Sequence, residues 1–191
     1  MSAAEPAVEL AKRSDAVRNR LRVLAAAEAV FAERGIEAGV PEIAERAGVG
    51  KATVYRSFPT KEHLIAAVSL ARLEDFEQRV RARLDAPDAW QALHELMRDS
   101  AGRQCVDRAI TSALASGVAQ EQLAAARASM WEAVTELLER AKGEGRIAPD
   151  VTAADLRVLW AGATRVLAAD GNGDPAAWRR YAGLVLRALS A

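Results

Sequence analysis

The segment VPEIAERAGVGKATVYRSF, residues 40–58, has the internal spacing of a helix-turn-helix. If Val40 is counted as the first residue, the fifth is Ala44, the ninth is Gly48 and the fifteenth is Val54. Two helices that cross at a steep angle need a small residue where they touch, which Ala44 supplies. The tight turn between them needs a positive φ, which Gly48 adopts at no steric cost. Val54 is expected to point inward, and the spacing predicts two short helices joined by a tight turn.

The second of these helices, residues 51–57, presents a face that suits nucleic acid. Opposite the buried Val54, that face carries two cations, hydroxyl groups and no carboxylate: Lys51, Ala52, Thr53, Tyr55 and Arg56. The chain has 26 acidic residues, yet none between residues 47 and 61. A solvated helix face usually carries charges of both signs, so we interpret this face as one that meets phosphate. Three arginines upstream are expected to add positive charge: Arg18, Arg20 and Arg22.

The composition is that of a folded helical protein. The chain has 191 residues, of which 51% are hydrophobic, with 26 basic and 26 acidic residues. This excludes a disordered chain and one that coats nucleic acid through its overall charge. Alanine occurs 44 times and favours helix. The single cysteine, Cys105, excludes an internal disulfide and a multi-cysteine zinc site. We find no signal-peptide core and no apolar run of about 18 residues, so no membrane span is expected and the expected location is the cytoplasm.

Caps, helix breakers and apolar spacing predict an all-α fold of about nine helices. Residues 1–15 are expected to form a mobile N-terminal arm, because they are small, polar and mixed in charge. Thr152 and Asp155 have the spacing of a capping box, and Asp174 with Pro175 is expected to open the last helix. The helices are expected at about residues 14–34, 40–47, 51–57, 60–84, 87–101, 104–115, 119–142, 152–169 and 175–191.

Two stretches of the first half resemble the N-terminal domain of TetR-family transcriptional repressors. They are IAERAGVGKATVYRSFPTKEHL, from Ile43 to Leu64, and the pattern LAAAE…FAERG over residues 24–35. The resemblance covers roughly residues 16–76 and implies a DNA-binding domain there, with its helix-turn-helix at about residues 39–58. Residues 77–191 would then form a ligand-binding and dimerisation domain.

The resemblance also implies how individual residues meet DNA. Tyr55 and Lys61 would each hold a backbone phosphate, and free N–H groups near Gly39 and Val40 would lie on the DNA backbone. The residues that would face the major groove are Lys51, Ala52, Thr53 and Arg56. The family often has threonine at position 39 and serine at position 50, where this chain has glycine. Phosphate binding at those positions would therefore rest on backbone N–H groups.

The last two predicted helices are apolar on more than one face. Few polar residues interrupt the apolar run from residue 156 to residue 169, and the helix after Pro175 is also apolar at most positions. A helix that is apolar on two sides needs two partners, and we infer that one of them is a second copy of the chain. The resemblance likewise implies a homodimer through these two helices.

Large, soft side chains in the second domain are candidates for binding a small molecule. They are Trp90, His94, Met97, Met130 and Trp131. The same residue types at helical spacing are also typical of a plain hydrophobic core, and His94 fits a half-exposed histidine equally well. Cys105 is expected to be a small buried hydrophobe rather than a redox sensor.

Taken together, these features predict a DNA-binding transcriptional regulator. By resemblance it is a repressor that binds a palindromic operator as a dimer and is released by a small-molecule effector. The alternative is a helical sensor or protein-interaction module whose helix-turn-helix no longer binds DNA, and the basic face argues against it. The sequence has no catalytic constellation, phosphate-binding loop or metal-ligand spacing, so no enzymatic activity, cofactor or metal is expected.

Overall fold

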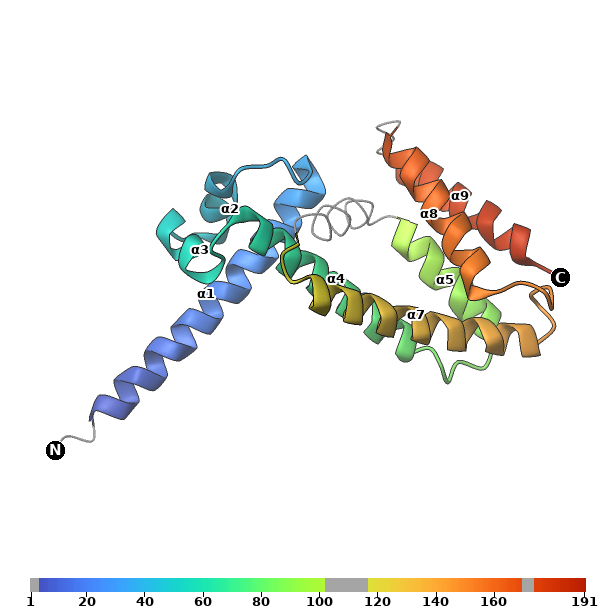
Figure 1. Ribbon diagram of the computed structural model, residues 1–191, viewed down its shortest axis with the longest axis horizontal. Helices are drawn as coiled ribbons and strands as arrows, with labels where there is room; N and C mark the ends of the chain where they lie inside the picture. The colour runs from blue at the N-terminus through green and yellow to red at the C-terminus, as the bar shows by residue number, and fades with distance from the viewer. Residues whose placement is uncertain (1–3, 102–116, 170–173) are drawn as a thin grey trace. The chain divides into compact units, whose positions relative to one another are not determined.

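The computed structural model describes residues 4–101, 117–169 and 174–191, and every regular element in these ranges is a helix (Figure 1). Eight helices lie in the described ranges, and one isolated antiparallel bridge joins Ile147 to Ser190. The prediction of an all-α fold is therefore confirmed. The helix predicted over residues 104–115, and Cys105 within it, lie outside the described residues.

The chain divides into two compact units within one helix. Unit 1 holds the described residues up to Ser69 and residues 117–119, and unit 2 holds residues 70–101 and the described residues from Gln120 onward. The division falls inside α4 (Lys61–Arg81), which therefore contributes residues to both units. The predicted domain boundary also lies in this helix.

Unit 1 consists of α1 (Ala4–Arg34), α2 (Val40–Ala47), α3 (Lys51–Ser57) and the first part of α4. The two short helices begin and end where the sequence predicts. Gly48 turns the chain between them with a φ of 63°, and its N–H donates to carbonyls in the last turn of α2. Both short helices pack against α1. The buried side chains of this unit include Val23, Ala27, Val30, Phe31, Ile43, Ala44, Val54, Phe58 and Leu64.

The first helix begins earlier than the sequence analysis predicts. Residues 4–13, expected to belong to a mobile arm, are helical, so α1 starts at Ala4 rather than near residue 14. The segment has three alanines, two glutamates and a leucine, which are strong helix formers, and Pro6 stands in the first turn, where its missing N–H costs nothing. Ser14 and Asp15, expected at the N-cap, are exposed residues in the interior of the helix.

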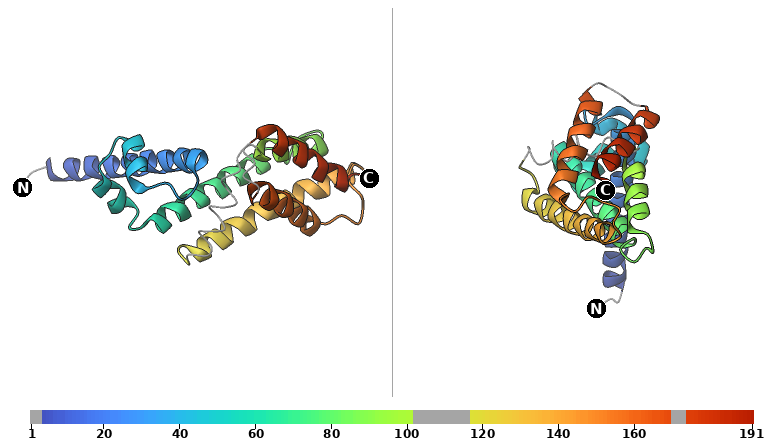
Figure 2. Two further views of the ribbon diagram at one scale, coloured as in Figure 1. Left: turned by 90° about the horizontal axis from the view of Figure 1, so that it is seen from above. Right: turned by 90° about the vertical axis from the view of Figure 1, so that its right-hand side faces the viewer.

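Unit 2 packs four helices and the end of α4 around a main core, with a smaller buried cluster of Leu167, Trp178 and Ala182. The helices are α5 (Ala89–Ala101), α7 (Gln120–Gly143), α8 (Ala153–Ala169) and α9 (Pro175–Leu189). α5 packs on α7 and α9, and α8 lies beside α9 in antiparallel orientation (Figures 1 and 2). The core includes Val80, Leu93, Leu96, Met97, Val134, Leu137, Leu138, Ile147, Leu156, Leu186 and Leu189.

The starts of α8 and α9 are each capped by a side chain that is close in sequence, as the sequence predicts. The backbone N–H of Thr152 donates to Asp155 Oδ2 at 2.8 Å, and the N–H of Asp155 donates to Thr152 Oγ1 at 3.3 Å. This reciprocal pair is a capping box. At the start of α9, the N–H of Ala176 donates to Asp174 Oδ1 at 2.8 Å, with Pro175 directly after the cap.

The start of α5 is capped from another part of the chain. Glu144, just after α7, accepts hydrogen bonds from the N–H groups of Ala89 at 2.8 Å and Trp90 at 3.2 Å. Asp88 adds a local cap by accepting from the N–H of Gln91 at 2.6 Å. These carboxylates suit the positive end of the helix dipole, and Glu144 thereby ties the end of α7 to the start of α5.

None of the described helices is both long enough and apolar enough to cross a membrane.

Candidate nucleic-acid interface

The exposed face of α3 carries the residues that the sequence analysis singles out. Val54 and Phe58 anchor the helix with side chains that are 1% and 2% exposed. On the opposite side, Tyr55 is 48% exposed and Thr53 is half-buried. The other members of the face, Lys51, Ala52 and Arg56, are exposed. This short helix thus brings together two cations, a phenol and a hydroxyl group.

Within this face, Arg56 and Thr53 lie on adjacent turns and contact each other. Arg56 Nη2 donates to Thr53 Oγ1 at 3.3 Å. The hydroxyl holds one nitrogen of the guanidinium along the helix, and the Arg56 side chain is exposed. A guanidinium held in this way matches the paired acceptors of a guanine edge or a phosphate.

The starts of α2 and α3 leave backbone N–H groups available. Gly39 is the N-cap of α2 and Gly50 the N-cap of α3, both have extended backbone, and no described side chain caps either helix start. Gly39 is half-buried and Val40 is buried, so the main chain rather than a side chain would meet a ligand there. Pro41 has no N–H, and the N–H groups of Glu42 and Ile43 donate to the carbonyl of Gly39, so those of Gly39 and Val40 are the ones that would suit an anion.

From the sequence, the three arginines of α1 are expected to add positive charge to the basic face. In the structure, all three instead have partners within the protein. Arg20 Nη1 donates to the carbonyl oxygen of Ser57 at 2.7 Å, and its guanidinium lies 4.2 Å from the centroid of the Phe58 ring. Arg22 Nη2 donates to the carbonyl of Gly48 at 3.4 Å. Arg18 pairs with Asp15 within α1. Two of the three arginines therefore bind the backbone of the helix-turn-helix itself.

Two ion pairs join the end of α1 to α2. Arg46 Nη1 lies 2.6 Å from Glu33 Oε2, and Arg34 Nη1 lies 2.8 Å from Glu42 Oε2. The hydrogen bond from Arg46 lowers the pKa of Glu33 below its ordinary value and raises the pKa of Arg46. These pairs cross between the two helices, so they hold α2 in place at the surface.

Lys61 is the first residue of α4, four positions after the last residue of α3. Lys61 is half-buried. Thr60 accepts from the N–H of His63 at 3.4 Å and caps the helix. Glu62 beside it has a lowered pKa, chiefly because of its hydrogen bond with Thr60. The turn between α3 and α4 therefore ends in a cation next to a capped helix start.

Three of the five candidate ligand residues of unit 2 are part of the core or pack against it. Met97 is buried in the core, and Trp90 and Trp131 pack on the same cluster. The rings of Trp90 and His94 lie 6.3 Å apart on one side of α5. Met130 is half-buried beside Trp131 on α7. The structure thus gathers three of these five side chains at one core.

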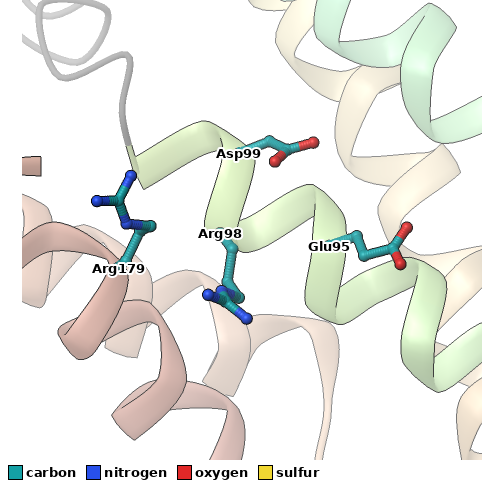
Figure 3. Close-up of a pocket in the computed structure, with 4 residues that line it drawn as sticks. All are labelled: Glu95, Arg98, Asp99 and Arg179. Carbon is teal, nitrogen blue, oxygen red and sulfur yellow. The ribbon is translucent and has the colours of Figure 1, made fainter. Parts of the chain in front are cut away.

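A surface hollow of about 360 Å³ in unit 2 has charged walls that the sequence analysis did not single out. Its lining residues are Glu95, Arg98 and Asp99 of α5 and Arg179 of α9. Figure 3 shows that these side chains point in different directions and do not converge on one point. All four lining residues are charged and exposed, whereas a typical small-molecule pocket is lined mainly by hydrophobic and aromatic side chains.

Comparisons with known proteins agree with this geometry. The family model described as bacterial regulatory proteins, tetR family, matches residues 23–68, and the model of the SbtR-like transcriptional regulator C-terminal domain matches residues 88–191. A search of curated proteins gave no match.

Several solved structures share the fold. The TetR transcription regulatory protein from Mycobacterium vanbaalenii is 31% identical over 94% of this chain and 99% of that one, with a TM-score of 0.68. The TetR transcriptional regulator SCO0520 from Streptomyces coelicolor is 30% identical over 90% of this chain and 98% of that one, also with a TM-score of 0.68. The transcriptional regulator FadR from Bacillus subtilis, solved in complex with stearoyl-CoA, is 16% identical over 87% of this chain and 95% of that one, with a TM-score of 0.61. The two family models and the first two similarities show that the chain belongs to the TetR family of DNA-binding transcriptional regulators.

Proposed function

We propose that this protein is a cytoplasmic repressor that binds an inverted-repeat operator as a homodimer and leaves it when a small, mainly apolar molecule binds unit 2. The observation that carries the proposal is the exposed face of α3. Its cations and hydroxyl groups stand opposite the buried Val54 and Phe58, and the sequence has no carboxylate from residue 47 to residue 61. Such a face is built to approach phosphates and base edges.

We assign some of these residues to base edges and the others to phosphates. Residues on the exposed face of α3 would read base edges in the major groove: Lys51, Ala52, Thr53 and Arg56. Tyr55 and Lys61 would hold phosphates, because a phenol and an ammonium at the edge of the face suit the DNA backbone. Gly39 and Val40 would add backbone N–H groups from the start of α2.

The homodimer is supported by apolar side chains on the outer side of α8 and α9. Val158 is 67% exposed and Val166 is 60% exposed, two turns further along α8. Tyr181 and Leu184 stand one turn apart on α9 and are also exposed. Ordinary surfaces rarely expose such a stripe on two adjacent helices, so a second copy of the chain would cover it.

An effector would act through the helices that pack on α4. Ser129 of α7 donates to Glu77 Oε1 at 2.8 Å, and Arg81 Nε donates to the same oxygen at 2.7 Å. These hydrogen bonds, chiefly that from Arg81, lower the pKa of Glu77. A ligand that displaces α7 would therefore pull on the same helix that carries Lys61 at its start. The FadR structure in complex with stearoyl-CoA, a ligand with a long apolar acyl chain, supports a ligand with a large apolar part for this fold.

Selection from a random-sequence DNA library tests the proposal. The full-length protein is expected to enrich an inverted repeat whose half-sites lie roughly one helical turn, about 34–36 Å, or somewhat more apart. Enrichment of no sequence at all would show that the helix-turn-helix does not read DNA. Enrichment of a single half-site without symmetry would contradict binding as a dimer.

A further inference from the structure

The recognition helix α3 is too short to hold its own orientation. It has seven residues, and no described side chain caps its start. An isolated helix of this length is not stable in water, so its position depends on what it packs against. Val54 and Phe58 anchor its apolar side. Its C-terminal end is held by a contact from α1.

That contact is the guanidinium of Arg20. It donates a short hydrogen bond, 2.7 Å, to the carbonyl oxygen of Ser57, the last residue of α3. Carbonyl groups at the end of a helix have no partner within the helix and carry partial negative charge, so a cation there is doubly favourable. The bond links two residues 37 positions apart in the chain.

The same guanidinium also covers the residue that ends the helix. Its carbon lies 4.2 Å from the centroid of the Phe58 ring, which is 2% exposed. Phe58 is the C-cap of α3, with its N–H bonded to the carbonyl of Val54, and Pro59 follows it. A planar guanidinium can stack on a ring and donate in its own plane at the same time, which an ammonium cannot do.

We propose that Arg20 is a positioning residue for DNA recognition, which fixes the C-terminal end of α3 so that its side chains meet base edges in register. This inference rests on the proposed function. In the structure, Arg20 Nη1 donates to Ser57 of the protein itself, so part of its guanidinium is committed to α3. Losing the contact would let α3 shift or fray, and base contacts depend on position far more than phosphate attraction does.

The test uses Arg20→Lys, which keeps the positive charge but loses the planar guanidinium that lies on the Phe58 ring and donates to Ser57. Titrations would measure binding to the duplex selected by the wild-type protein and to a scrambled duplex of equal length. Arg20→Lys is expected to weaken binding to the selected duplex roughly tenfold, which is the size of losing one base contact. The affinity for the scrambled duplex and the slope of log affinity against log salt concentration should stay unchanged. Arg18→Lys, on the same helix but paired with Asp15, is the matched control and should change neither affinity.

Further variants separate positioning from other roles. Arg20→Gln keeps a donor without the charge, and thermal melting would confirm that each variant is folded at the titration temperature. If Arg20→Lys discriminates between the duplexes as well as wild type, the inference is wrong. It is also wrong if Arg20→Gln lowers the affinity for both duplexes equally and reduces the slope of log affinity against log salt concentration by about one. That is the behaviour of a phosphate contact. A wild-type protein that selects no duplex would instead remove the proposed function, and this inference with it.

Discussion

At the scale of single residues, the turn of the helix-turn-helix depends on Gly48. Its φ is 63°, and a Cβ atom there would also lie 2.8 Å from Arg22 Nη2. The arginine tip can move aside, but an alanine cannot avoid the left-handed backbone. We expect Gly48→Ala to lower the free energy of unfolding by about 1–2 kcal/mol, measured by urea denaturation. Gly50→Ala is the matched control, because Gly50 has a φ of −72° and open space around it. Equal losses in both variants would mean that the turn does not require a positive φ.

Residue-level features could be predicted where cause and effect are close in the chain. The positive φ of Gly48, the capping box at Thr152 and the N-cap at Asp174 each follow from residues within three positions. The contacts of Arg20 with Ser57 and of Glu144 with Ala89 could not be predicted, because they join residues 37 and 55 positions apart. Only the packing of the helices brings such pairs together. From the sequence alone, Arg20 is therefore expected only to add positive charge near α3.

At the scale of helices, the start of α8 carries a testable pH dependence. Hydrogen bonds from the hydroxyl and backbone N–H of Thr152 lower the pKa of Asp155 below its ordinary value. A carboxyl with a depressed folded-state pKa stabilises the fold above its unfolded pKa of about 4, and the stabilisation is lost as pH falls through the folded value. The stability difference between wild type and Asp155→Asn should therefore be largest near pH 7 and shrink as pH falls below about 4. Chemical denaturation across that range checks it, with the exposed Asp150→Asn as control. A difference that stays constant with pH would contradict the assignment.

Helix existence was easier to predict than helix ends. α2 and α3 matched their predicted bounds because glycine and proline mark both ends of the segment. The predicted start of α1 is wrong. Ser14 and Asp15 are residue types that often cap helices, but the alanine-rich residues before them continue the helix. Pro6 marks the true first turn.

At the scale of the whole molecule, the proposed dimer depends on the outer side of α8 and α9. Val158→Glu places a charge at the most exposed valine of this surface, where a second copy of the chain would have to bury it. We expect light scattering at micromolar concentration to give a dimer for wild type and a monomer for this variant. Val17→Glu changes a similarly exposed valine, 58%, on α1 and should leave the dimer intact. A monomeric wild type, or a dimeric Val158→Glu, would contradict the proposed interface.

The proposed function depends most on whether the exposed face of α3 reads DNA sequence. Selection from a random library, run in parallel with wild type and Arg56→Ala, tests this claim most directly. Arg56 would contribute base discrimination of about 1–3 kcal/mol if it reads a guanine edge. We expect the variant to lose base preference at one position, symmetrically in both half-sites, and to keep the remaining preferences. Identical base preferences in wild type and Arg56→Ala would contradict the assignment of this face to base recognition.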